Sequence, residues 1–322
     1  MAVYTKIDNQ DLFSLSDSYK LGKITKSKGI KKGIENTNYL LKTNKSKFIL
    51  TIFERRVQKK DLPFFMRLME KLNQKKIICP KPLKNSKGKH LSQIKNKPAS
   101  IVTFLNGSDK ANLNYKNCFD IGKNIAKFHK ATSKIKLYRE NSMSIKKLGG
   151  LLKSIDFKSN KISSKLKLTL NMCFEDIRSQ WPKKLPSGII HGDLFIDNIF
   201  FNKNKFSGFI DFYFSSNDYL MYEIAICINA LCFDKKRNSF KMNHKKVKNL
   251  IDGYETIRPF TKNEKRALNI LCRGAALRYL LTRIYDYSNT PKTALIKVKN
   301  PNEYFQKLIF HNNLNNYKDY YK

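Results

Sequence analysis

The sequence lacks the usual signatures of zinc-binding, membrane and secreted proteins. Its six cysteines form no Cys-x-x-Cys pair and no Cys/His cluster with zinc spacing. No run of about 18 apolar residues is present, so no transmembrane helix is expected. The first 20 residues contain acidic side chains and no apolar segment, so no signal peptide is expected. We therefore predict a cytoplasmic protein with reduced, buried thiols and no membrane partner.

Acidic residues are scarce as well. There are 25 Asp and Glu against 64 Lys and Arg, which gives a formal net charge of +39. An excess of this size first suggests nucleic acid as a partner. However, only 11 of the basic residues are Arg, the side chain that reads bases and binds phosphate in a bidentate way. The lysines are also spread over the whole chain. We interpret the charge as compositional bias and expect no nucleic-acid partner.

The length of 322 residues and the 41% hydrophobic content are enough for two lobes with a buried core. Two short apolar and β-branched runs, 35–43 and 48–54, predict an antiparallel hairpin. Residues 61–72 have apolar side chains at helical spacing, with Asp61 as the predicted N-cap. Another strand is predicted at 99–105.

These elements predict an α+β fold that begins with a small β-rich lobe, residues 1–105, and continues with a larger and mainly helical lobe, residues 106–322. In the second lobe, apolar periodicity predicts helices at 118–131, 219–233 and 263–287, one ending near Trp181, and one beginning at Pro301. Very short strands are predicted at 189–191, 199–201 and 206–211.

The segment His191-Gly-Asp-Leu-Phe-Ile-Asp-Asn198 carries the strongest chemical signal. It matches the kinase pattern H-x-D-x-x-x-x-N, and a strand ending in Asp211 follows at the interval where kinases place a metal-binding aspartate. Asp193 could orient an acceptor hydroxyl and take its proton. Asn198 and Asp211 offer hard oxygen ligands for the Mg²⁺ that accompanies a triphosphate. His191 is expected to brace the loop. The alternative, that these are ordinary turn residues, would have to explain their identities, order and context together.

The chain resembles the homoserine kinases that share the fold of aminoglycoside and choline phosphotransferases. The resemblance runs from about residue 30 to the C-terminus. The segment Ile190-His-Gly-Asp193 supports only the wider superfamily. The segments that narrow the resemblance to homoserine kinases are Leu62-Pro-Phe-Phe65, Asp211-Phe-Tyr-Phe214 and Arg273-Gly-Ala-Ala-Leu-Arg278.

This resemblance implies a two-lobed, protein-kinase-like fold and the ATP-dependent phosphorylation of the side-chain hydroxyl of L-homoserine. The product would be O-phospho-L-homoserine, on the route to threonine. ATP and Mg²⁺ are the implied cofactors. The adenine would meet backbone groups of Thr103, Phe104 and Leu105, where the strand leaves the small lobe.

The chain departs from the superfamily pattern at two charged positions. Related kinases place a Lys on the third strand of the small lobe, facing the phosphates, and Thr51 stands there. Thr51 could line the nucleotide site but cannot supply the charge. The residues that could supply the positive charge of the missing lysine are Arg55, Arg56, Lys28, Lys31 and Lys32. In addition, Glu223 stands where the superfamily usually has Asp, which should alter a bracing contact but keep its charge.

The substrate implied by the resemblance is a zwitterion, so its site should offer a cation for the carboxylate and an anion or carbonyls for the ammonium. Arg278 or Arg273, both on one predicted helix, is our candidate for the carboxylate. Tyr213 and Asp218, close to the metal-binding strand, are further candidates for lining the substrate site.

Two other functions stay open at this point. The acceptor could be another amino alcohol of the choline, hydroxylysine or aminoglycoside type. Alternatively, the chain could be a non-catalytic, kinase-like binding protein, which the missing small-lobe lysine would favour and the intact Asp193, Asn198 and Asp211 argue against.

Overall fold

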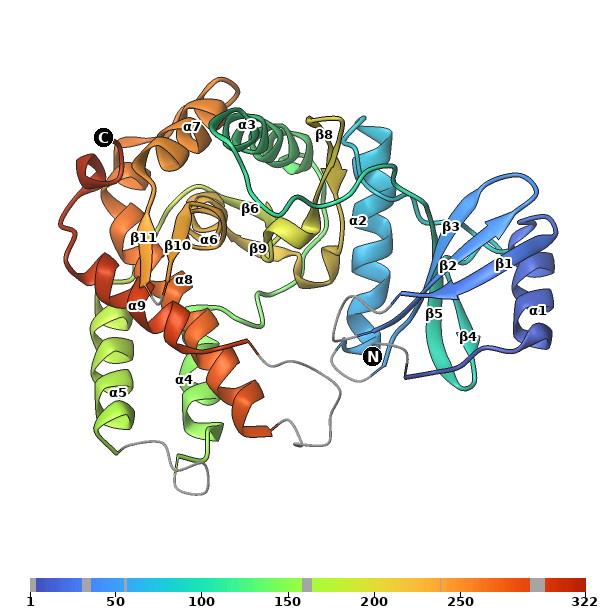
Figure 1. Ribbon diagram of the computed structural model, residues 1–322, viewed down its shortest axis with the longest axis horizontal. Coiled ribbons are helices and arrows are strands. Elements are labelled where there is room, and N and C mark those ends of the chain that lie inside the picture. Colours follow the sequence, from blue (N-terminus) through green and yellow to red (C-terminus); the bar gives the residue numbers. More distant parts are fainter. Residues whose placement is uncertain (1–3, 31–35, 55–56, 158–163, 238, 290–298) are drawn as a thin grey trace. The chain divides into compact units, whose positions relative to one another are not determined.

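The computed structural model describes residues 4–30, 36–54, 57–157, 164–237, 239–289 and 299–322. The chain divides into two compact units. The first comprises Met1–Gly107, Ile135–Arg139 and Ser207–Tyr213, and the second comprises Ser108–Lys134, Glu140–Phe206 and Phe214–Lys322. The predicted fold class is confirmed: the first unit is built on an antiparallel sheet and the second is mainly helical (Figure 1).

The first unit contains a five-stranded sheet in the order β1-β2-β3-β5-β4, with antiparallel pairing throughout. The strands are β1 Ile24–Gly29, β2 Thr37–Thr43, β3 Lys47–Ile52, β4 Leu91–Ile94 and β5 Lys97–Thr103. The predicted hairpin is the β2–β3 pair, and the predicted strand 99–105 is β5. Strand β1, which is largely exposed, and strand β4, which has only four residues, were not predicted.

One face of this sheet forms a core with helix α1, Asn9–Tyr19, which packs beside β1 (Figure 1). Tyr39 and Leu41 alternate inward along β2 and meet Leu50 of β3. Leu15 and Tyr19 of α1 cover them. The period-two alternation of a half-buried strand therefore sets which side chains enter the core.

Helix α2, Leu62–Gln74, confirms the predicted amphipathic helix, with Pro63 in its first turn. Asp61 occupies the N-cap position, but its side chain makes no capping hydrogen bond. Instead, its carboxylate accepts from Nε of Arg139 at 2.7 Å, and the Arg139 guanidinium lies 5.0 Å from the Phe65 ring. The predicted capping role is therefore wrong, because an ion pair holds the carboxylate.

The second unit is formed mainly by helices. They are α3 Tyr115–Thr132, α4 Ile145–Ser154, α5 Ser164–Ser179, α6 Leu220–Leu231, α7 His244–Glu255, α8 Lys262–Asn289 and α9 Asn302–Asn312. The helix predicted to end near Trp181 is α5, and α4, which precedes it, was not predicted. The short strands are β6 Ser187–Ile190, β7 Ile199–Asn202, β8 Lys205–Phe209, β9 Ser216–Tyr219, β10 Phe233–Lys236 and β11 Ser239–Met242. Strand β8 begins in this unit and continues into the first.

Helices α3 and α7 approach each other at two glycines. A Cβ atom at Gly122 would lie 1.9 Å from the backbone oxygen of Leu250, and one at Gly253 would lie 2.0 Å from that of Phe119. Such a close backbone approach leaves no room for any side chain. The two glycines therefore fix the crossing of α3 against α7.

Helices α6 and α8 form the buried centre of the second unit and pack against each other. Their burial explains why α6 is apolar around most of its circumference. In the described part of the chain, no helix has both the length and the hydrophobicity needed to cross a membrane.

Candidate active site

The loop that carries the H-G-D motif follows β6 and depends on its glycine. Gly192 has φ +78°, and a Cβ there would lie 2.8 Å from the carbonyl oxygen of Phe214. The left-handed conformation and the lack of space both require glycine. Gly192 thus turns the chain so that Asp193 begins the loop.

Asn198 closes this loop onto Asp193. Its amide nitrogen donates to the backbone oxygen of Asp193 at 2.8 Å and to the carboxylate Oδ2 at 3.3 Å. Because the amide nitrogen is engaged in this way, the amide oxygen is the atom suited to a hard cation such as Mg²⁺. The five-residue spacing read from the sequence therefore brings Asp193 and Asn198 into contact.

Glu223 of α6 holds the start of the loop through the backbone. Its carboxylate accepts hydrogen bonds from the N–H groups of His191 and Gly192, the latter at 3.1 Å to Oε1. Burial raises the pKa of Glu223 to about 7, and the two backbone donors lower it by less. Glu223, which is one methylene longer than the usual Asp, thus still reaches the loop. The charge of the Glu223 carboxyl group depends on pH.

His191 is itself buried, at 1% exposure. Besides its bond to Glu223, its backbone oxygen accepts from Oγ of Ser215 at 3.4 Å. These are contacts of the kind that a bracing residue makes. His129 of α3 is a packed core histidine: its Nδ1 lies 2.8 Å from the Tyr254 hydroxyl, and burial lowers its pKa to about 3.

Arg278 of α8 is the buried cation of this region, with 3% exposure. Its guanidinium lies 4.8 Å from the Tyr279 ring and 6.0 Å from that of Phe214. Among the described residues, its Nε and Nη1 atoms have no hydrogen-bond partner. Burial lowers the pKa of Arg278, but neighbouring tyrosines and Asp193 outweigh it and raise the pKa overall. A charged guanidinium with unused donors is thus held near Asp193.

Asp218 of β9 belongs to the same group of residues. Its Oδ2 accepts from the amide nitrogen of Asn141 at 2.6 Å, and its Oδ1 accepts from the backbone N–H of Tyr219 at 2.7 Å. Burial raises the pKa of Asp218, while these donors and the charge of Arg278 lower it. Burial outweighs these contributions, so the pKa of Asp218 is raised overall, and Arg278 is one of the groups whose charge acts on it.

Arg273 contrasts with Arg278, although both lie on α8. Its guanidinium pairs with the carboxylate of Asp176, and its Nε donates to the side-chain oxygen of Asn312 at 2.8 Å. These contacts tie α8 to α5 and to the end of α9. Of the two candidate arginines, only Arg278 combines burial with unused donors.

The remaining predicted residues lie in the first unit. Asp211 comes shortly after β8 and has φ +62°, which is uncommon for a residue with a side chain. The ring of Tyr213 makes edge contacts with Phe53 at 5.0 Å and Phe65 at 5.7 Å. Burial and Asp211 raise the pKa of Tyr213, while the Thr51 side chain lowers it. Tyr213 thus packs against aromatic side chains of the first unit.

Thr51 is 3% exposed, and its hydroxyl donates to the side-chain oxygen of Asn38 on β2 at 2.8 Å. This hydroxyl is therefore engaged within the sheet. Of the candidate replacement cations, Lys28 lies exposed on β1. Arg55, Arg56, Lys31 and Lys32 lie outside the described residues.

The predicted adenine segment follows the end of β5. The amide N–H of Thr103 donates to the Lys81 oxygen at 2.9 Å, and that of Phe104 donates to the Lys47 oxygen at 3.2 Å. Leu105 comes next and is half-buried. These bonds fix the backbone at the point where β5 ends.

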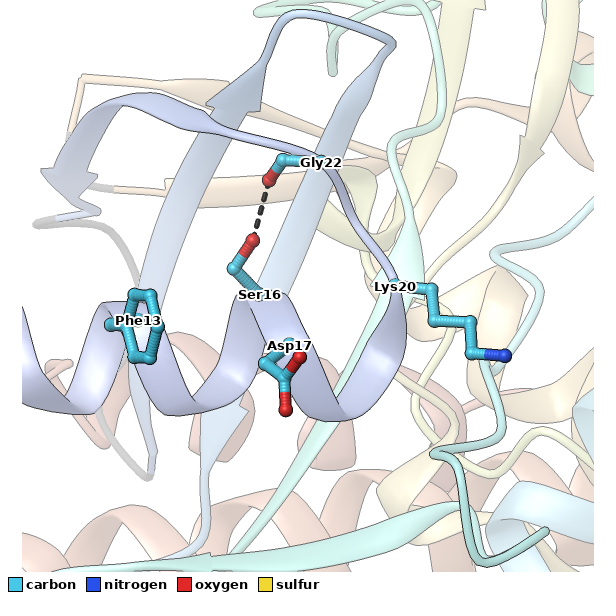
Figure 2. Close-up of a pocket in the computed structure, with 5 residues that line it drawn as sticks. All are labelled: Phe13, Ser16, Asp17, Lys20 and Gly22. Atoms are coloured by element: carbon cyan, nitrogen blue, oxygen red, sulfur yellow. Dashed lines mark hydrogen bonds between the residues drawn. The ribbon is translucent and has the colours of Figure 1, made fainter.

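Two surface cavities lie away from all of these residues. One, of about 280 Å³, is lined by Phe13, Ser16, Asp17, Lys20 and Gly22. Figure 2 shows Phe13, Ser16 and Asp17 on α1, Lys20 at its end and Gly22 beyond it, with the bond from the Ser16 hydroxyl to the Gly22 oxygen. The other, of about 400 Å³, lies between the end of α5 and the beginning of α8. Neither includes a predicted site residue.

Sequence reasoning missed Tyr222, Tyr279 and Asn141, which surround Arg278 and Asp218. Tyr279 directly follows Arg278 in the sequence, but consecutive helix residues do not share a face, so a predicted helix alone does not suggest it. Nothing local marks Asn141, because its role depends on a contact with a residue 77 positions away.

Comparisons with known proteins identify the family of the chain. Residues 26–260 match the phosphotransferase enzyme family, APH. The homoserine kinase of Agrobacterium fabrum is 40% identical over 320 residues, which cover 99% of this chain and 98% of that protein. The homoserine kinase of Paramagnetospirillum magneticum is 41% identical over 317 residues, covering 97% of this chain and 96% of that protein.

Solved structures share the fold at low sequence identity. An amicoumacin kinase has a TM-score of 0.72 at 14% identity, covering 95% of this chain and 92% of its own. A choline kinase from Cryptosporidium parvum has a TM-score of 0.64 at 15% identity, covering 98% of this chain and 100% of its own. The chain therefore belongs to the phosphotransferase enzyme family, in the branch of its homoserine kinase relatives, and is an ATP-dependent kinase.

Proposed function

We propose that the chain transfers the γ-phosphoryl group of ATP to the side-chain hydroxyl of L-homoserine. Asp193 takes the hydroxyl proton, the freed oxygen attacks the γ-phosphorus, and ADP leaves. The product is O-phospho-L-homoserine. The full-length similarity to homoserine kinases supports the substrate.

The observation that carries this proposal is the pair of opposite charges in the second unit. Arg278 is buried with unused Nε and Nη1 donors, and its charge acts on the carboxyl group of Asp218, whose pKa is raised overall by burial. Homoserine carries a carboxylate and an ammonium group at one end. We assign Arg278 to the carboxylate and Asp218 to the ammonium, because charge-assisted hydrogen bonds give the strongest and most selective contacts.

Asn198 and Asp211 are the proposed Mg²⁺ ligands. The contacts of Asn198 direct its amide nitrogen to Asp193, so its oxygen fits a hard cation. Asp211 contributes a carboxylate, the other ligand type that Mg²⁺ prefers. When bound, the ion would neutralise negative charge on the triphosphate.

A coupled ADP-release assay over a panel of hydroxyl-bearing amino compounds tests the proposal. The panel contains homoserine, serine, threonine, hydroxylysine, choline and an aminoglycoside. We expect Mg²⁺-dependent turnover that strongly favours homoserine. Asp193→Asn should lose most of kcat with little change in ATP binding, and Asp211→Ala should abolish the use of Mg·ATP. Preference for another alcohol would overturn the substrate, and Mg²⁺-independent binding of polyanions without turnover would overturn the kinase mechanism for this site.

A further inference from the structure

The hydroxyl of Tyr279 lies directly against the proposed base. It is 3.3 Å from Oδ1 of Asp193 and 3.3 Å from the backbone oxygen of Gly192. The two acceptors are consecutive residues of the H-G-D motif. A phenol on α8 thus contacts both the carboxylate and the backbone of the same loop, although 86 positions separate it from Asp193.

The tyrosine ring is held firmly by its neighbours. Phe195 meets it edge-on at 4.8 Å, Tyr304 of α9 packs at 5.2 Å, and the Arg278 guanidinium lies 4.8 Å from it. The side chain is 7% exposed. Since contacts from the loop, α8 and α9 surround the ring, its hydroxyl has little freedom to leave Asp193.

The chemistry of the hydroxyl fits a donor at this position. Burial raises the pKa of Tyr279 well above its ordinary value, so the hydroxyl keeps its proton. A carboxylate accepts but cannot donate when it is ionised. Asn198 approaches Oδ2 of Asp193, and Tyr279 approaches Oδ1. Donors on both oxygens restrict the rotation of the carboxylate about its χ angles.

We propose that Tyr279 is a positioning residue for the phosphoryl transfer, whose hydroxyl fixes the orientation of the Asp193 carboxylate within the loop. This inference rests on the proposed role of Asp193 as the base. Tyr279 acts through Asp193 and does not itself bind substrate. Its contribution belongs to the chemical step, because a misplaced base costs rate even when both substrates are bound.

Tyr279→Phe removes the hydroxyl and keeps the ring contacts. We expect kcat to fall about tenfold, the effect of one hydrogen bond to a charged group, while KM for homoserine and for ATP change less than about twofold. The matched control is Tyr304→Phe. Tyr304 is fully buried against Tyr279, and its hydroxyl has no hydrogen-bond partner among the described residues. This control should leave kcat and both KM values unchanged.

A double-mutant cycle separates positioning from a structural effect. In the Asp193→Asn background, Tyr279→Phe should cause no further loss of kcat, because its target is already disabled. Equal losses of kcat in both backgrounds would overturn the inference. So would a Tyr279→Phe variant that matches Tyr304→Phe, or one that changes only KM or thermal stability.

These outcomes differ from a failure of the proposed function. If the wild type prefers another alcohol, the substrate assignment is wrong, and the double-mutant cycle is measured with that alcohol. If Asp193→Asn keeps full activity, Asp193 is not the base, and the inference about Tyr279 is overturned as well. If Asp193→Asn is inactive and Tyr279→Phe equals its control, only the Tyr279 inference is overturned.

Discussion

Glu223 should make the stability of this protein depend on pH. The carboxylate is fully buried beneath the H-G-D loop, and burial raises its pKa from 4.5 to about 7. Below pH 4.5 the side chain is protonated in both the folded and the unfolded chain, so its titration costs nothing. As the pH rises from 4.5 to 7, the unfolded chain releases the proton and the folded chain keeps it.

The free energy of unfolding therefore falls over this range. A pKa difference of this size corresponds to about 3 kcal/mol, because one pKa unit is worth about 1.4 kcal/mol. The loss is complete above pH 7. Glu223→Gln keeps the size of the side chain and does not titrate, so the contribution should be absent from the variant.

Urea unfolding at pH values from 4 to 8 measures this effect. Trp181, the single tryptophan, lies 5.6 Å from the ring of Tyr222 next to Glu223 and reports the transition by fluorescence. The free energy of the wild type minus that of Glu223→Gln should fall by about 3 kcal/mol between pH 4.5 and 8. Glu175→Gln, at an exposed ion pair with Arg178, should give a flat difference. A flat difference for Glu223→Gln as well would refute the reasoning.

Two further changes test the substrate site and the helix packing. Arg278→Ala should raise KM for homoserine about 100-fold and leave KM for ATP unchanged, because it removes the proposed partner of the homoserine carboxylate. The control is Arg273→Ala, since the Arg273 side chain is already bonded to Asp176 and Asn312. Equal effects of the two substitutions on KM in steady-state kinetics would contradict the assignment of Arg278. Gly122→Ala should destabilise the protein by about 3 kcal/mol in urea unfolding, because its Cβ would lie 1.9 Å from the Leu250 oxygen. Gly150→Ala, where a Cβ meets no atom within 4 Å, should be neutral or slightly stabilising, and similar losses for both glycines would disprove the packing argument.

The local pattern of apolar and polar residues is sufficient to predict much of the secondary structure. The alternation in β2, the apolar run in β3 and the helical spacing in α2 and α3 depend on residues close together in the sequence, so the sequence alone predicts these elements. The capping prediction for Asp61 failed because a distant residue, Arg139, binds its carboxylate. The short hairpin β10–β11 and the edge strands β1 and β4 also lacked a local signal, since their few residues are mostly exposed or charged.

The H-G-D motif, with its predicted acidic residue Asp193, can be read from the sequence alone. The spacing from His191 to Asn198 is short enough for one loop to impose its geometry, and the contact between Asn198 and Asp193 follows from it. Spacing also predicts helix α8, but not which of its faces is buried.

Only the tertiary structure distinguished Arg278 from Arg273 and brought Tyr279 to Asp193. Helix phase is set by packing against α6 and α9, and packing depends on residues far away in the chain. The same long-range burial decides the charge of Glu223, because a carboxylate that would ionise in water is held away from it.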